Sequence, residues 1–239
     1  MSNELKARCC ALKENYMVIM EKIAGAAQQS GRRPEDITLL AATKTVPVEV
    51  INYGIQMGIT TIGENRVQEF LSKEEALLPS VRHLIGHLQT NKVKQIVGRV
   101  RMIQSVDSER LAAEISRLSQ QKGIQTEVLV EVNIGKEENK SGVFAEELDS
   151  LLEKIDLLPG IRVCGLMTIP PICEKESEIR EYFSKMHKLF IDRQGKKMDN
   201  GNMAVLSMGM SGDYEQAILE GATMVRIGSA LFGARKYNS

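Results

Sequence analysis

Eight short apolar runs recur along the chain, and helical segments lie between them. The runs have the length of β-strands and are apolar almost throughout, which is typical of a parallel sheet whose outer face is covered. Eight strand–helix units in about 200 residues, without a linker, predict a (β/α)8 TIM barrel; a doubly wound open sheet is the alternative. The runs are "ITLLAAT", "TTIGEN", "RHLIGHL", "MIQSVD", "TEVLVEVN", "IRVCGLMT", "MAVLSMG" and "MVRIGSALFG".

A long amphipathic segment precedes the first run, from about Asn3 to Gln29. Its apolar residues recur at helical spacing, and "SGRRPED" then breaks the pattern. We therefore expect residues 1–239 to form a single barrel domain, in which residues 1–30 supply an additional helix packed on the barrel. The residues that carry the spacing are Leu5, Cys9, Leu12, Tyr16, Ile19 and Ile23.

The charge balance limits the classes of partner. The chain has 31 basic and 31 acidic residues, so nothing in it indicates binding to nucleic acid or to an anionic membrane. The amino terminus is charged and lacks the apolar core of a signal peptide or a membrane span. The four cysteines show no metal-ligand spacing and are interpreted as reduced thiols, so we expect a cytoplasmic protein without a metal site.

Polar residues follow the predicted strands, at the end of a barrel where active sites are built. Lys44 follows the first strand in "LLAATKTVP", and Asp107-Ser108 after the fourth is interpreted as a helix N-cap. "SMGMSGDYEQA" and "RIGSALFG" follow the seventh and eighth strands, where barrels of this class often hold phosphate with backbone N–H groups. The same glycines could instead form only a tight turn before a capped helix.

A lysine opposite a phosphate-binding loop suggests carbonyl chemistry. An amine with a lowered pKa attacks an aldehyde and forms an imine. A sugar-phosphate aldolase and a pyridoxal-phosphate protein would both use this pair. The position of Lys44 on the first strand favours the pyridoxal-phosphate protein, because Schiff-base aldolases usually carry their lysine on a late strand.

The motifs "ATKTVP", "GENRVQE", "HLIGHLQTNK", "VEVNIG", "KSG", "GLMTI", "LSMGMSGDYEQAI" and "GATMVRIGSALFG" occur in order along nearly the whole chain. In this the chain resembles the pyridoxal phosphate homeostasis family, also called the YggS-like or proline synthetase co-transcribed family, related in fold to the alanine racemase N-terminal barrel. The resemblance implies that Lys44 holds pyridoxal 5'-phosphate (PLP) as a Schiff base. It also implies that the phosphate is bound by Ser207, Gly209, Ser211, Arg226 and Gly228, with Asn65, His87 and Met167 near the ring.

The resemblance implies a role in intracellular PLP (vitamin B6) and amino-acid homeostasis without substantial turnover, with no catalytic residue established. Racemases of this fold type use a second, mostly β domain and two bases, and we expect this chain to lack that domain and to place Lys44 on one face only. His87 and Tyr214 are the candidates for a second base. The alternative is therefore a weak PLP-dependent racemase or lyase of fold type III. We expect a monomer or weak homodimer that could pass PLP to apo-enzymes.

Overall fold

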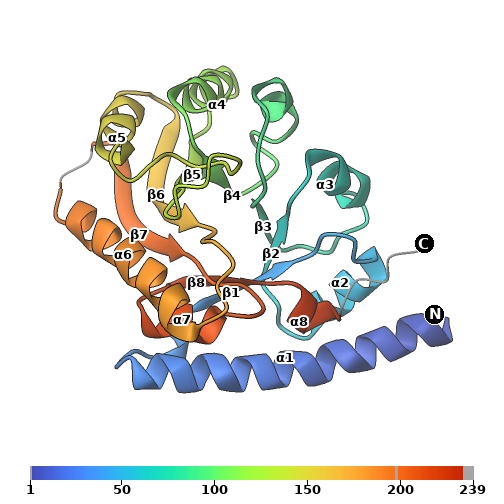
Figure 1. Ribbon diagram of the computed structural model, residues 1–239. Helices are drawn as coiled ribbons and strands as arrows, with labels where there is room; N and C mark the ends of the chain where they lie inside the picture. Colours follow the sequence, from blue (N-terminus) through green and yellow to red (C-terminus); the bar gives the residue numbers. More distant parts are fainter. Residues whose placement is uncertain (1, 197–198, 234–239) are drawn as a thin grey trace.

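The computed structural model describes residues 2–196 and 199–233, and its strands form one closed parallel barrel in chain order (Figure 1). The barrel closes because the first strand pairs in parallel with the last, with Leu40 opposite Arg226 and Ala41 opposite Ile227. This closure confirms the predicted TIM barrel and excludes the open sheet. The strands are β1 (Thr38–Ala42), β2 (Thr61–Glu64), β3 (Val81–Leu84), β4 (Met102–Val106), β5 (Thr126–Val132), β6 (Ile161–Thr168), β7 (Gly201–Ser207) and β8 (Met224–Ile227).

Helices surround the barrel and connect successive strands (Figure 1). The α-helices are α1 (Asn3–Gln29), α2 (Val48–Gln56), α3 (Val67–Lys73), α4 (Glu109–Gln121), α5 (Leu148–Asp156), α6 (Glu176–Gln194), α7 (Tyr214–Leu219) and α8 (Ser229–Phe232). Two short 3-10 helices, η1 (Pro34–Asp36) and η2 (Thr90–Gln95), complete the set.

The structure differs from the prediction in three segments. The "NKVKQIVG" segment forms η2 rather than an α-helix. The third strand ends at Leu84, so "IGHL" lies beyond it, and the end of "MVRIGSALFG" turns into α8. Apolar periodicity alone does not separate a short strand from a strand followed by one helical turn, and Gly228 makes the break here.

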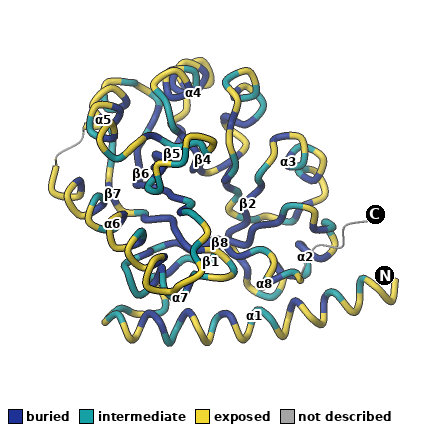
Figure 2. Tube along the Cα trace, in the orientation of Figure 1, coloured by how far each residue is buried: buried dark blue, intermediate teal, exposed yellow. Residues whose placement is uncertain are grey.

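The core has two layers. The main cluster packs the outward-facing strand residues against the helices and is continuous from Leu12 and Ile23 of α1 to Leu231 of α8. Two smaller clusters, around Leu40 and Met167, come from strand residues that alternate with those and fill the barrel. The dark strands of Figure 2 show this double burial, and it explains why the strand sequences are apolar without alternation.

The predicted amino-terminal helix is present and packs against α2, α7 and α8. Ser2 caps it by accepting a hydrogen bond from the Leu5 amide at 3.2 Å. Its predicted apolar face is largely buried, including Cys9, Leu12 and Ile19. The helix therefore packs beside the segment from β7 to α8, through its contacts with α7 and α8.

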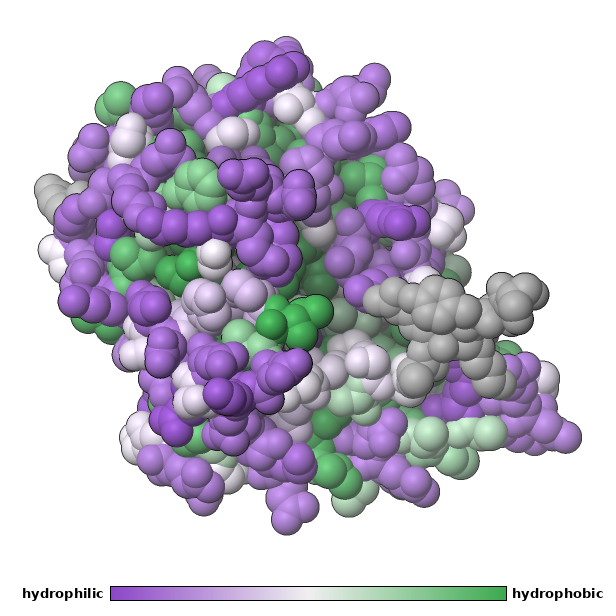
Figure 3. Space-filling view, viewed as in Figure 1, coloured by the Kyte–Doolittle hydropathy of each residue, from purple (hydrophilic) through white to green (hydrophobic). Residues whose placement is uncertain are grey.

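Polar residues cover most of the face shown in Figure 3, and a small group of hydrophobic side chains is visible near its centre. Within the described ranges, no helix is both long and apolar enough to cross a membrane. The four cysteines are free thiols, two of them buried.

Candidate functional site

Lys44 lies in a tight turn directly after β1. The Val46 amide donates to the Thr43 carbonyl at 3.0 Å, which closes the turn over Lys44 and Thr45. Leu40 and Ala42 belong to an apolar cluster inside the barrel. The Thr43 hydroxyl instead donates to Glu64 of β2, and the Thr43 carbonyl accepts from Lys73 of α3. The turn therefore carries the partly exposed Lys44 out of the strand at the carboxyl-terminal mouth of the barrel, as the sequence predicted.

The ends of β1 and β8 lie side by side. Strand pairing puts Leu40 opposite Arg226, and a Cβ added to Gly228 would lie 3.2 Å from the Ala42 carbonyl oxygen. Lys44 therefore lies two residues after Ala42, the β1 residue that is next to Gly228 at the start of α8. The structure brings together the two strand ends on which the proposed lysine and the proposed phosphate loop depend.

A second group of predicted residues surrounds the start of α8. The Ser211 hydroxyl oxygen accepts from the Gly228 amide at 3.2 Å and from the Ala230 amide at 3.1 Å. Gly209 has a φ of 89°, and an added Cβ would lie 2.5 Å from the Ala217 Cβ, so only glycine fits this bend. The loop after β7 and the loop after β8 are therefore joined through a hydroxyl and two backbone amides. Both amides donate to Ser211 Oγ, which leaves the Ser211 hydroxyl proton as the donor for an anion.

The side chains of Ser207 and Arg226 belong to a buried polar chain inside the barrel, and the Arg226 amide donates to the Gly209 carbonyl at 3.0 Å. The guanidinium of Arg226 donates to the Ser207 hydroxyl at 2.8 Å and to the Thr168 carbonyl at 2.9 Å. Ser207 donates to Gln104 Oε1 at 2.8 Å. Burial lowers the pKa of Arg226 to about 10, yet the group remains a cation at neutral pH.

The remaining predicted residues occupy different surroundings. The Asn65 side-chain oxygen is buried and has no hydrogen-bond partner among the described residues. Met167 is fully buried against Met102 and Leu129. His87 is 57% exposed, and its Nδ1 lies 3.6 Å from Asp107 Oδ2.

Of the residues considered as caps or bases, Ser108 is the N-cap of α4, accepting from the Leu111 amide at 3.4 Å. Asp107 lies beside His87 instead, with its Oδ2 3.6 Å from His87 Nδ1. Tyr214 is buried in the main core, where burial raises the pKa of its phenol. It therefore packs.

Sequence reasoning missed Glu131, a buried carboxylate on β5. One oxygen accepts from the Ser141 hydroxyl at 3.1 Å, and the other has no hydrogen-bond partner within the described part of the chain. Burial raises the pKa of this carboxyl, as does Asp107, whereas Arg226 and His87 oppose the rise. The signal was available as a charged residue inside the apolar run "TEVLVEVN".

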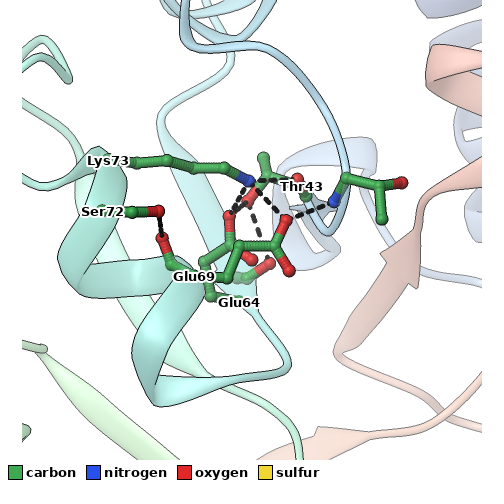
Figure 4. Close-up of polar contacts among 7 residues, drawn as sticks. Thr43, Glu64, Glu69, Ser72 and Lys73 are labelled. Atoms are coloured by element: carbon green, nitrogen blue, oxygen red, sulfur yellow. Dashed lines mark hydrogen bonds and ion pairs between the residues drawn. The ribbon is translucent and has the colours of Figure 1, made fainter.

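Sequence reasoning also missed Lys73, the cation with which Glu64 pairs. Lys73 of α3 is buried and donates to Glu64 Oε1 at 2.7 Å, to Glu69 Oε1 at 2.8 Å and to the Thr43 carbonyl at 2.9 Å (Figure 4). Lys73 is nine residues from Glu64 in the sequence. That spacing matches neither a helix face nor a strand face, so the sequence pattern did not identify the pair.

The residues present fit a phosphorylated aldehyde cofactor. A lysine, a buried cation, a hydroxyl with two amides and an orphaned amide oxygen all belong to the strand ends and the loops that follow them. No cluster of histidine, cysteine or acidic side chains in the described part of the chain could hold a metal ion.

Comparison with known proteins agrees with this geometry. Residues 11–236 match the family model described as "Alanine racemase, N-terminal domain". The chain is 48% identical over 226 residues to a pyridoxal phosphate homeostasis protein of Aquifex aeolicus, covering 94% of this chain and 98% of that one.

Two solved structures are similar along most of the chain. A crystal structure described as that of an unknown protein from Bifidobacterium adolescentis has a TM-score of 0.88 and 38% identity, covering 97% of both chains. PipY of Synechococcus elongatus, solved with PLP bound, has a TM-score of 0.77 and 31% identity, covering 88% of this chain and 100% of that one. These findings confirm the resemblance seen in the motifs, and the chain belongs to the pyridoxal phosphate homeostasis protein family, within the alanine racemase N-terminal domain family.

Proposed function

We propose that this protein binds PLP as a Schiff base on Lys44 and acts in intracellular PLP (vitamin B6) and amino-acid homeostasis, as the names of its relatives indicate. One observation carries the proposal. The turn with Lys44 adjoins the end of β8, where Ser211 Oγ and the Gly228 and Ala230 amides converge. The bound PLP of the related PipY structure supports the same cofactor.

When bound, PLP supplies an aldehyde that a lysine amine can attack, and a phosphate that needs hydrogen-bond donors. We assign Lys44 to the first task and Ser211 with the backbone of Gly209 and Gly228 to the second. Arg226 contributes a positive charge from inside the barrel, and Ser207 orients it by accepting a hydrogen bond from the guanidinium. Asn65, His87 and Met167 complete the predicted surroundings of the ring.

We further propose that residues 1–239 act as one PLP-binding domain in the cytoplasm, as a monomer or weak homodimer that releases PLP to apo-enzymes. The exposure of His87 supports a carrier rather than a catalyst, because a solvated imidazole does little to exclude water from a carbanion. Transfer is measured by mixing the loaded protein with an apo-enzyme and following the gain of enzyme activity.

A weak racemase or lyase is the second candidate, and Glu131 is the observation that favours it. Its carboxyl is buried, one oxygen is unpartnered and its pKa is raised, as a proton-transferring group requires. If Glu131 transfers protons to a substrate, Glu131→Gln abolishes turnover while PLP retention stays intact. A carrier shows no turnover to abolish.

The binding proposal is tested by titrating cofactor-free protein with PLP and recording the absorbance. The parent protein gives the band of a protonated Schiff base at one equivalent, and Lys44→Ala gives only the spectrum of free PLP. An unchanged band in Lys44→Ala overturns the proposal.

A further inference from the structure

The turn that carries Lys44 has an unusual backbone. Thr45 has a φ of 61°, in the left-handed region that a β-branched residue rarely adopts. Glycine or asparagine would take this third turn position without strain. A strained residue persists only where its surroundings hold it, and such positions cluster at functional sites.

Three side chains from the neighbouring elements hold this turn, and Figure 4 shows them converging on it. Glu69 of α3 accepts the Thr45 amide. Lys73 of the same helix donates to the Thr43 carbonyl at 2.9 Å. The Glu64 carboxylate of β2 accepts the Thr43 hydroxyl at 2.7 Å. The residues on both sides of Lys44 are thus fixed through their backbone or side chain.

The three side chains form one unit. The Lys73 ammonium has three protons and donates to Glu64, Glu69 and the Thr43 carbonyl, so all of them are used. Glu64 and Lys73 are buried, with side chains 2% and 10% exposed. Burial raises the pKa of Glu64, while the Lys73 ammonium and the Thr43 hydroxyl oppose the rise.

A buried ion pair is poor support for stability alone, because desolvation offsets much of its attraction. Its better-attested use is to select one geometry among several. Here the geometry selected is the strained turn next to the amine that the proposed function requires.

We propose that Glu64, Glu69 and Lys73 are positioning residues that hold the Thr43–Val46 turn, so that the Lys44 amine is presented to the cofactor in one orientation. The inference rests on the assignment of Lys44 in the proposed function. None of the three touches the cofactor in this account, and they act through the backbone on either side of Lys44.

The test compares Glu69→Ala, Glu69→Gln and a matched control. Glu69→Ala removes the acceptor of the Thr45 amide but leaves Glu64 to neutralise Lys73. Glu69→Gln keeps an oxygen that can accept. Glu114→Ala in α4 removes a similar helix ion pair, with Arg117, far from the turn in sequence; the Glu114 and Glu69 side chains are 26% and 21% exposed.

Two measurements are made on each protein. Hydrogen–deuterium exchange of the cofactor-free protein reports the Thr45 and Val46 amides, and stopped-flow absorbance reports the rate of PLP capture. We expect Glu69→Ala to expose both amides and to slow capture about tenfold, because misorientation of a reacting group is costly. Glu69→Gln restores most of the amide protection and most of the capture rate. Glu114→Ala changes neither the protection nor the rate.

Unchanged amide protection in Glu69→Ala overturns the inference, and so does parental capture by a variant whose turn has loosened. Equal slowing in Glu114→Ala also overturns it, since the effect would then be general destabilisation. A Lys44→Ala protein that still gains the covalent band defeats the proposed function instead, while the exchange data still show whether the cluster holds the turn.

Discussion

Arg226 donates to the Ser207 hydroxyl at 2.8 Å inside the barrel. This contact begins a chain of hydrogen bonds in which each group donates to the next. Ser207 donates to Gln104 Oε1 at 2.8 Å, and Gln104 Nε2 lies 2.8 Å from His83 Nδ1. Because Gln104 uses its oxygen for Ser207, its amide nitrogen donates and His83 Nδ1 must accept. The chain therefore runs from a buried cation to a neutral imidazole.

The neutrality of His83 predicts a pH-dependent stability. Burial, with a smaller effect of Arg101, lowers its pKa from 6.5 to about 4. On acidification the unfolded chain takes up this proton first, so stability is complete above the unfolded value and is lost as the pH falls toward about 4. The loss between about pH 7.5 and about pH 5 amounts to about 2 kcal/mol in the free energy of unfolding.

This prediction is checked by urea unfolding of the parent and of His83→Gln at about pH 7.5 and at about pH 5, which gives the free energy of unfolding of each protein. The other titrating groups are shared by the two proteins, so the difference in slope isolates His83. A variant that loses as much stability as the parent on acidification contradicts the neutral chain.

Gly86→Ala tests the packing beneath Asn65. A Cβ at Gly86 would lie 2.2 Å from the Asn65 carbonyl oxygen, and backbone cannot yield as a flexible side chain does. We expect a loss of about 1–3 kcal/mol in unfolding free energy and weaker PLP retention. Gly25→Ala in α1 is the control, since nothing lies within 4 Å of its added Cβ. Chemical denaturation and PLP titration report both effects, and parental PLP affinity in Gly86→Ala argues against a role for Asn65.

Ser211→Ala tests the phosphate loop. The serine oxygen accepts hydrogen bonds from two amides, so its hydroxyl proton can be donated in a hydrogen bond to a phosphate oxygen. We expect about tenfold or greater loss of affinity for PLP, as for a hydrogen bond to a charged group, and little loss for unphosphorylated pyridoxal. Ser2→Ala, which removes a hydroxyl that accepts an amide at the start of α1, leaves both affinities unchanged. Equal losses for PLP and pyridoxal refute the phosphate assignment.

Deuterium exchange separates the carrier from the weak racemase. We expect the loaded protein to wash out the α-deuterium of amino acids no faster than free PLP does, because His87 is largely exposed. Proton NMR of the amino acid follows the exchange. Washout at enzyme-like rates that disappears in Glu131→Gln would establish turnover and assign its base.

The sequence predicted the barrel because each strand carries an apolar signature that only two-sided burial explains. It also predicted which strand ends carry Lys44, Ser211 and Gly228, since parallel strands present their ends at one mouth. It did not show that the Arg226 guanidinium donates to the Ser207 hydroxyl, because a strand-end list does not show which side chains turn into the barrel. Lys73 stayed hidden for a related reason: its partner lies on another element, and only the packing of α3 on β2 brings them together.

Reduction of the PLP-loaded protein with borohydride, followed by peptide mass mapping, tests the central claim most directly. We expect one reduced pyridoxyl phosphate adduct per chain, located on Lys44 and lost in Lys44→Ala, whereas Lys185→Arg, at an exposed position of α6, still accepts it. An adduct on another lysine, or full labelling of Lys44→Ala, would contradict the account.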